Sequence, residues 1–259
     1  MLSALLLGIL EGLTEFLPVS STGHLIVADA LLHFDDKGKV FEIVIQMGAI
    51  LAVVWLYRAR FWHVVQHLLH DRTEQHFVRN IFLAFLPALV LGALLHDFIK
   101  DQLFNTTVVA AALIVGGIAI LLIERFKPQP VVDSTEAMTW RTALAIGFFQ
   151  CVSMIPGFSR SGATIMGALL CRVTRPAAAE FSFSSPCRRW SPPRSTTSTR
   201  TATTLSGGSM ELIAIGFVAA FIVALVVVRW LIRFVQTHGF EPFAYYRILL
   251  GIVILYFVR

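Results

Sequence analysis

Two interruptions in an otherwise apolar chain read FLPVSSTGHLI (Phe16–Ile26) and MIPGFSRSGATI (Met154–Ile165). Each follows an apolar run with a proline, passes through a turn rich in Ser, Gly or Thr, and begins a new apolar run. The new runs, Leu25–Leu32 and Ile165–Leu170, are too short to cross a bilayer, which takes about 20 residues of helix. Irregular backbone at membrane depth is tolerated only where protein buries it or where it lines a cavity. The pattern therefore predicts two re-entrant, broken helix pairs.

The composition of the chain supports a membrane setting. Its 259 residues are 56% hydrophobic and 14% charged, with a mean hydropathy of +0.75, whereas a soluble domain is roughly 45–50% apolar and about 25% charged. The net charge of +5 does not indicate nucleic acid, because the basic residues lie in connections between apolar runs, as positive-inside loops do. We expect an all-α integral membrane protein, one multi-spanning domain over residues 1–259.

The order of the apolar runs gives the chain an orientation. Apolar windows expected to form transmembrane segments are Val40–Tyr57, Ile81–Leu95, Thr106–Ile123, Leu212–Leu231 and Phe240–Val258. Two spans separate the basic connections Arg58–Arg79 and Arg125–Arg141, so both lie on one side, expected to be the cytoplasm. The first interruption then enters the membrane from outside and the second from inside. This predicts two inverted repeats, about 1–124 and 139–259, whose broken helices meet near the midplane.

A pair of carboxylates precedes the first interruption. Glu11 and Glu15 are four residues apart, so they share one helix face. Ionisable groups at membrane depth are costly, at least about 2.5–3.5 kcal/mol on insertion scales. The pair is therefore a candidate for metal binding or acid–base chemistry; the alternative is a helix end that touches water.

The first interruption also carries hydroxyls and a histidine. Ser20, Ser21 and Thr22 follow Pro18, and His24 falls in the first turn of the next helix. A capped helix N-terminus attracts anions, and histidine exchanges protons near neutral pH. The alternative is that the hydroxyls only cap the helix and that His24 lies at the interface.

The second interruption adds a cation. Arg160 is surrounded by the hydroxyls of Ser159, Ser161 and Thr164. An arginine fork beside a helix N-terminus is a phosphate cradle in physical terms; the alternative is that Arg160 snorkels to the interface. Glu42 and Gln46 share a face of a neighbouring apolar run and are expected at most to support the polar centre; the alternative is a plain hydrogen bond between helices.

These strings resemble the two motifs of the bacterial undecaprenyl-diphosphate phosphatase family, the bacitracin-resistance proteins. The stretches that carry the resemblance are EGLTEFLPVSSTGHLI (Glu11–Ile26), PGFSRSGATI (Pro156–Ile165), FEIVIQMGAILAVV (Phe41–Val54) and EPFAYYRILLG (Glu241–Gly251). The resemblance implies hydrolysis of undecaprenyl diphosphate to undecaprenyl phosphate and inorganic phosphate, which recycles the lipid carrier of peptidoglycan synthesis and confers bacitracin resistance. It also implies a multi-pass protein of the bacterial plasma (inner) membrane whose active site opens to the outer face.

The resemblance also assigns roles to residues. Catalytic roles fall on Glu11, Glu15, Ser21, His24 and Arg160, and phosphate binding falls on Ser20, Thr22, Ser159, Arg160, Ser161 and Thr164. A divalent cation, Mg²⁺ or Ca²⁺, is expected on Glu11 and Glu15. We expect His24 to activate Ser21 or to protonate the leaving oxygen, and Ser21 or a water to attack. We expect membrane lipid around the chain. The sequence leaves open whether the protein is a monomer or a homodimer.

Two rival functions share parts of this pattern. Inverted repeats with broken helices are typical of transporters, in which a buried carboxylate pair suits ion coupling. A polyprenyl-phosphate flippase would use the same cradle without hydrolysis. The hydroxyl–histidine–arginine set favours the phosphatase, because transport of a neutral solute needs no phosphate chemistry.

One segment departs from the family pattern. Ser184–Thr204 is rich in Arg, Ser, Thr and Pro and cannot span a membrane, whereas the family continues with an apolar helix. Codons can be chosen for this segment whose alternative frame encodes an apolar helix followed by a polar loop. We hypothesise a compensated frameshift; the alternative is a genuine lineage-specific loop. Resequencing the gene distinguishes the two.

Overall fold

Helices dominate the computed structural model, which describes residues 1–32, 40–95, 99–103, 105–184 and 207–257. Along the chain these are α1 (Leu2–Thr14), α2 (Ser21–Leu32), α3 (Val40–Leu56), α4 (Arg58–His67), α5 (Arg72–Leu94), η1 (Ile99–Leu103), α7 (Thr106–Phe126), α8 (Trp140–Cys151), η2 (Val152–Met154), α9 (Arg160–Leu170), α10 (Arg175–Ser184), α11 (Gly207–Thr237) and α12 (Glu241–Phe257). No β-strand occurs in these ranges, so the all-α prediction is confirmed. The suspected frameshift segment, 184–204, lies outside the described residues except for Ser184.

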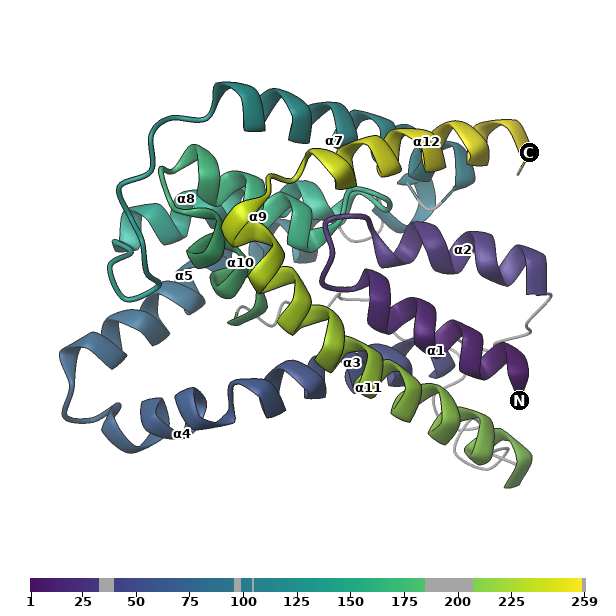
Figure 1. The fold of residues 1–259 in the computed structure, drawn as a ribbon, viewed down its shortest axis with the longest axis horizontal. Helices are drawn as coiled ribbons and strands as arrows, with labels where there is room; N and C mark the ends of the chain where they lie inside the picture. Colours follow the sequence, from purple (N-terminus) through teal and green to yellow (C-terminus); the bar gives the residue numbers. More distant parts are fainter. Residues whose placement is uncertain (33–39, 96–98, 104, 185–206, 258–259) are drawn as a thin grey trace.

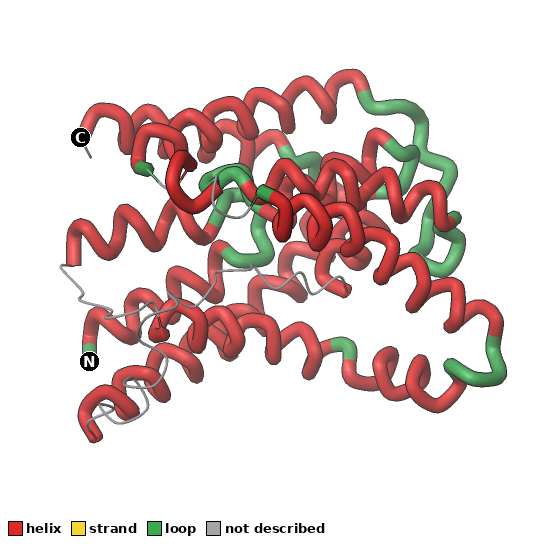
Figure 2. The backbone as a smooth tube through the Cα atoms, turned by 180° about the vertical axis from the view of Figure 1, so that it is seen from behind, coloured by secondary structure: helices red, strands yellow, loops and turns green. Residues whose placement is uncertain are grey.

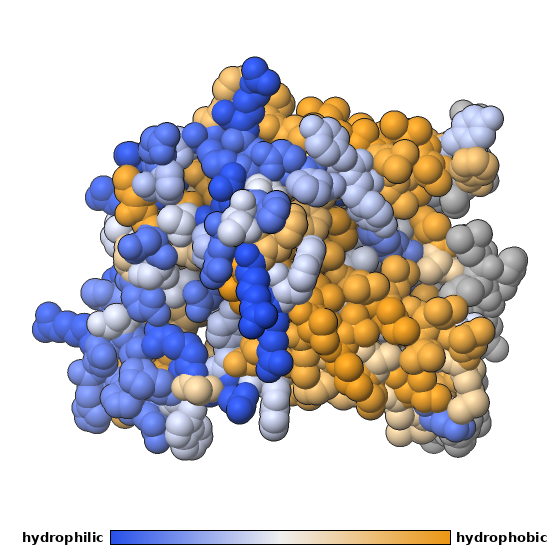
Figure 3. Space-filling model, viewed as in Figure 1, coloured by the Kyte–Doolittle hydropathy of each residue, from blue (hydrophilic) through white to orange (hydrophobic). Residues whose placement is uncertain are grey.

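Three described helices are long and apolar enough to cross a bilayer. These are α5, α7 and the Met210–Thr237 part of α11, and α3 with α4 would make a fourth, bent by 69°. Hydrophobic residues cover the right-hand part of the surface in Figure 3, over α1, α11 and α12, while hydrophilic residues gather at the left-hand end. An apolar flank of this kind is what lipid contact requires, so the chain is a membrane protein.

The basic connection at Arg58–Arg79 is more helical than predicted. Instead of a loop, it forms α4 and the first turns of α5. A local cap explains part of the difference, because Asp71 accepts a hydrogen bond from the Thr73 amide (2.8 Å) at the start of α5. The charges of this stretch thus lie on the short helix α4 and on the first turns of the long helix α5.

Both basic connections lie at the same end of the molecule, as predicted. The Arg60 guanidinium donates to buried Glu74 at 2.6 Å and also pairs at 2.9 Å with Glu136, in the loop after α7. The α4–α5 turn and this loop both lie at the left in Figure 1.

Two broken helices run into the centre of the molecule. The chain turns between α1 and α2 at Pro18, and between α8 and α9 at Pro156 (Figures 1 and 2). Helix α9 is buried along most of its length, which suits a short helix that ends inside protein. The start of each broken pair packs on a long helix: α1 on α11, and α8 on α5; α7 packs on α12.

Glycines allow these helices to approach closely. A Cβ atom on Gly8 of α1 would lie 2.3 Å from the Gly216 carbonyl oxygen of α11. A Cβ on Gly147 of α8 would lie 2.6 Å from the Ala84 carbonyl oxygen of α5. Both contacts are shorter than any side chain tolerates, so each broken helix is held at backbone distance from its neighbour.

Candidate active site

The two interruptions share one local geometry. Ser20 and Ser159 both have left-handed backbones, with φ of 71° and 73°, which is uncommon for a residue other than glycine. The hydroxyl of Ser20 accepts from the Gly23 amide (3.4 Å), and that of Ser159 accepts from the Gly162 amide (3.1 Å). Each serine therefore caps the helix that follows, and the N-termini of α2 and α9 carry partial positive charge into the molecule.

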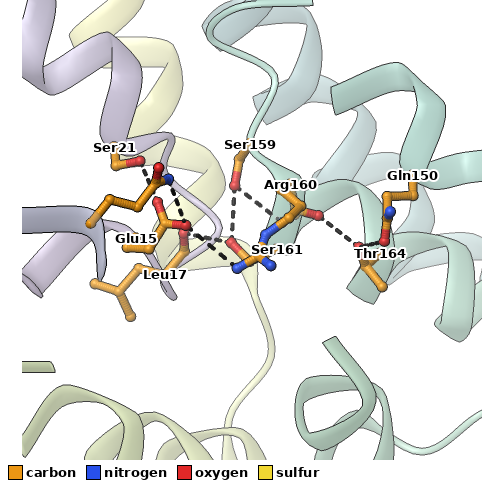
Figure 4. A network of polar contacts seen from close by, with 10 residues as sticks. Glu15, Leu17, Ser21, Gln150, Ser159, Arg160, Ser161 and Thr164 are labelled. Atoms are coloured by element: carbon orange, nitrogen blue, oxygen red, sulfur yellow. Dashed lines mark hydrogen bonds and ion pairs between the residues drawn. The ribbon is translucent and has the colours of Figure 1, made fainter. Parts of the chain in front are cut away.

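Glu15 joins the two interruptions through its carboxylate (Figure 4). One oxygen, Oε2, accepts from the Ser21 hydroxyl at 2.7 Å. The other, Oε1, lies 3.3 Å from the Gln46 amide nitrogen and 3.5 Å from Arg160 Nη2. One carboxylate thus contacts α2, α3 and α9. The Gln46 contact places this side chain at the polar centre, and it is at the same time a hydrogen bond between neighbouring helices, so a supporting role of Gln46 stays a prediction.

Hydroxyls complete the contact between the loops. Ser161 donates to the Leu17 carbonyl oxygen (2.9 Å) and lies 3.0 Å from the Ser159 hydroxyl. Thr164 donates to the carbonyl oxygen of Arg160 at 2.8 Å. The start of α9 is therefore held against the turn that follows α1 (Figure 4).

His24 has partners of its own. Its Nδ1 lies 2.8 Å from the Ser20 carbonyl oxygen, and its Nε2 lies 2.6 Å from the Tyr246 hydroxyl. A carbonyl oxygen only accepts, so Nδ1 carries the proton, and in the neutral ring Nε2 accepts from Tyr246. In this arrangement Ser21 is paired with Glu15 and not with His24.

The site is enclosed. Its buried polar side chains include Glu11, Glu15, Ser20, Ser21, Thr22, His24, Ser159, Ser161 and Thr164. Among the described residues, the Thr22 hydroxyl has no hydrogen-bond partner. Buried polar groups ordinarily have one, so Thr22 is free to bind an anion at the start of α2.

Comparison of the sequence with known proteins shows the family of this chain. The family model described as bacitracin resistance protein BacA matches residues 4–253. The chain belongs to this family. It is 52% identical to an undecaprenyl-diphosphatase of Parvibaculum lavamentivorans, over 99% of this chain and 96% of that protein. It is 48% identical to undecaprenyl-diphosphatase 1 of Mesorhizobium japonicum, over 96% of this chain and 94% of that protein.

The structure brings most of the predicted site residues of this BacA-family chain together. Glu15, Ser21, Ser159, Arg160 and Ser161 are joined by the contacts given above. Thr164 extends that network along α9, and Ser20 and Thr22 lie at the start of α2. Glu11 lies one turn before Glu15 on α1, and His24 faces α12. The catalytic and phosphate-binding roles of these residues stay predictions.

Glu11 and Glu15 are two buried carboxylates one helical turn apart at the end of α1. Glu11 and Glu15 are 1% and 9% exposed, and within the described ranges no group of three His, Cys, Asp or Glu side chains could hold a metal alone. Mg²⁺ binds through one or two carboxylates together with substrate phosphates. The residues present therefore fit a divalent cation that shares its ligands with a diphosphate.

Three residues at the site were missed at the sequence level. Tyr246 and Arg247 of α12 contact His24 and the two loops, and Gln150 of α8 lies 3.4 Å from the Thr164 hydroxyl. The signal for Arg247 was present, because an arginine inside an apolar segment is expensive and marks a functional position. Tyr246 and Gln150 carried no such signal.

Proposed function

We propose that the protein hydrolyses undecaprenyl diphosphate to undecaprenyl phosphate and inorganic phosphate. One observation carries the proposal: the Ser21–Glu15–Arg160 chain joins a hydroxyl, a carboxylate and a guanidinium from two loops in one buried site. The names of the relatives agree with it. The reaction returns the lipid carrier to peptidoglycan synthesis and gives bacitracin resistance, the property for which the family is named.

The terminal phosphate binds between the two capped helix starts. Arg160 moves from Glu15 to the phosphate, since a 3.5 Å contact is weak and a doubly charged anion competes well for the fork. Hydroxyls of Thr22 and Ser159 and the amides of α2 and α9 donate to the remaining oxygens. These donors also stabilise the charge that develops on the phosphoryl oxygens in the transition state.

Glu15 is the base. Its Oε2 already accepts from Ser21, so it takes the proton as the attacking oxygen forms its bond to phosphorus. That oxygen belongs to Ser21 or to a water in its place, and the anhydride oxygen leaves on undecaprenyl phosphate. If Ser21 attacks, water later cleaves the phosphoserine. His24 acts as the acid only after its Nε2 has taken up a second proton, which it then supplies to the leaving oxygen while Nδ1 stays bonded to the Ser20 carbonyl oxygen.

Glu11 and Glu15 would hold the divalent cation. Such an ion would neutralise phosphate charge and help to orient the diphosphate. Lipid chains of the substrate lie between helices and face the bilayer, and the site opens to the outer face of the plasma membrane.

We also propose that residues 1–124 and 139–259 are inverted repeats with two re-entrant pairs. The equal cap geometry of Ser20 and Ser159 supports this. So does the exchange of partners, in which α1 packs on α11 and α8 packs on α5, each across the repeat boundary.

The test is phosphate release by detergent-purified protein from undecaprenyl diphosphate with Mg²⁺. Release that disappears with EDTA supports the enzyme. No release, together with movement of labelled lipid phosphate across reconstituted vesicles, would instead support a flippase. Uptake of a neutral solute by the vesicles would support a transporter.

A further inference from the structure

Arg247 is the largest fully buried side chain of the described residues, at 1% exposure. From the middle of α12 its guanidinium reaches both broken-helix loops. Nη1 donates to the Pro18 carbonyl oxygen and Nη2 to the Gly157 carbonyl oxygen, each at 3.1 Å. It also donates to two carbonyl oxygens of α7, those of Ala112 at 3.2 Å and Leu113 at 3.4 Å.

We infer that Arg247 is a positioning residue that fixes the two loops against each other, so that Ser21 and Arg160 face one phosphate. Pro18 lies two residues before the cap Ser20, and Gly157 lies two residues before the cap Ser159. One rigid fork therefore holds both loops at corresponding points. The inference rests on the proposed phosphatase activity, which it deepens by naming what sets the spacing of the site.

The neighbouring helices leave room for the guanidinium. A Cβ on Gly116 of α7 would lie 2.1 Å from Nη2, and a Cβ on Gly162 of α9 would lie 3.2 Å from Nη1. The Phe158 ring lies 5.7 Å from Cζ, within the range of a cation–π contact. A residue other than glycine at position 116 would displace the fork.

The charge of Arg247 is not balanced by protein in the part of the chain that the structure describes. Salt-bridge partners within 4.0 Å are found there for Arg60, Arg160 and Arg175, whereas Arg247 bonds only neutral carbonyls. A buried cation without a counter-ion is costly, and a diphosphate at the adjacent helix caps supplies the missing negative charge. Lysine cannot replace the fork, because a single ammonium does not reach four carbonyls in the required directions.

The first experiment measures kcat and KM for phosphate release by R247K and R247A, each per folded molecule. Misplacing the reacting groups by about 1 Å costs roughly 100-fold in rate, so we expect kcat to fall by about that factor in both variants. Methylguanidinium added to R247A fills the vacated space and raises its rate about tenfold or more. Exposed Arg233 provides the control, since R233A should keep the wild-type rate with or without the additive.

A second variant moves the fork without removing it. G116A places a methyl group on Nη2 and should lower kcat in the wild-type background, yet cost little more in R247A, where the space is empty. Gly92→Ala is the matched glycine control, because its Cβ meets only the Met154 sulfur, at 3.6 Å. A purely structural role would instead lower the fraction of folded protein and leave the rate per folded molecule unchanged.

The outcomes separate the two proposals. Wild-type protein that releases no phosphate overturns the proposed function, and this inference with it. An active wild type beside an equally active R247K overturns the inference alone. So does an R247A that has the wild-type rate per folded molecule and that methylguanidinium does not accelerate. Loss of kcat in R247K, rescue of R247A and a non-additive G116A/R247A pair support it.

Discussion

Glu15 contacts residues from both halves of the site. It accepts from Ser21 of α2 and from Gln46 of α3, and it contacts Arg160 of α9. The sequence could predict Glu15 and Arg160 because charge inside apolar runs is rare and costly. It could not predict which hydroxyl pairs with which base, because that depends on the turn at Pro18. In the structure Ser21 is hydrogen-bonded to Glu15, and His24 is hydrogen-bonded to Tyr246.

Tyr246 orients His24, and its hydroxyl can be removed alone. In Y246F the Nε2 atom loses its 2.6 Å partner, while Nδ1 keeps its bond to Ser20. We expect kcat to fall by about three- to tenfold with KM little changed, since one hydrogen bond to a neutral ring is worth about 1 kcal/mol. The neighbouring Tyr245, 63% exposed, is the control, and Y245F should match the wild type. Equal rates in all three proteins would contradict the role of Tyr246.

The breaks between α1 and α2 and between α8 and α9 lie where the sequence predicted interruptions. Proline followed by serine and glycine marked both of them, whereas the re-entrant character of the two pairs stays a prediction. Prediction failed at Arg58–Arg79, where a charged stretch folds into α4 and the start of α5. The density of charged residues predicted a solvated loop, but an amphipathic helix at the end of a bundle also exposes charged residues to solvent.

The turn before α9 requires a glycine at position 157. Its φ is +94°, and a Cβ there would lie 2.5 Å from the Val109 carbonyl oxygen. In G157A we therefore expect a loss of roughly 2 kcal/mol or more in unfolding free energy, from strain and overpacking together. A lowered thermal midpoint in detergent measures it. Gly92→Ala is the comparison, and a G157A midpoint as high as that of G92A would contradict the geometry.

Three elements are tied at Glu124, near the end of α7. Its buried carboxylate accepts from Arg175 Nε (3.0 Å) and Nη2 (2.7 Å), and from the Phe240 amide (3.0 Å) before α12, and it pairs with Lys127. Glu124 is buried but Arg175 is about a third exposed, so the loss of this partner costs about 1–3 kcal/mol, less than for a pair buried on both sides. R175Q should lie near the lower end, because Lys127 and the amide remain.

The thermal midpoint of R175Q in detergent tests this tie. Arg172 is a suitable control, since it makes only an exposed bond to the Gln129 carbonyl oxygen. If R175Q were as stable as R172Q, the Glu124 cluster would not hold these elements together.

At the scale of the whole molecule, the sequence predicted an all-helical membrane protein and the pairing of its basic connections at one end. It could not give the helix contacts, because these depend on glycines such as Gly8 and Gly147 whose importance appears only when a neighbouring backbone lies beside them. The frameshift hypothesis for Ser184–Thr204 also belongs to this scale, and resequencing the gene tests it.

The orientation in the membrane has a direct test. Leu69, at the α4–α5 turn, is 80% exposed, and Leu95, after α5, is 43% exposed. With the native cysteines replaced, L69C should react with an impermeant thiol reagent only from the cytoplasmic side, because basic connections stay inside. L95C should react only from outside. The reverse pattern in right-side-out spheroplasts would contradict the outward-opening site.

Phosphate release by E15Q, R160A and the double variant, from protein expressed from the resequenced gene, tests whether two loops form one phosphatase site. Each single change should lower kcat by roughly 100-fold or more. The double variant should be little slower than the slower single one, since residues that act as a unit are non-additive. Near-wild-type release by either single variant, or fully multiplicative losses in the double, would contradict a single site shared by Glu15 and Arg160.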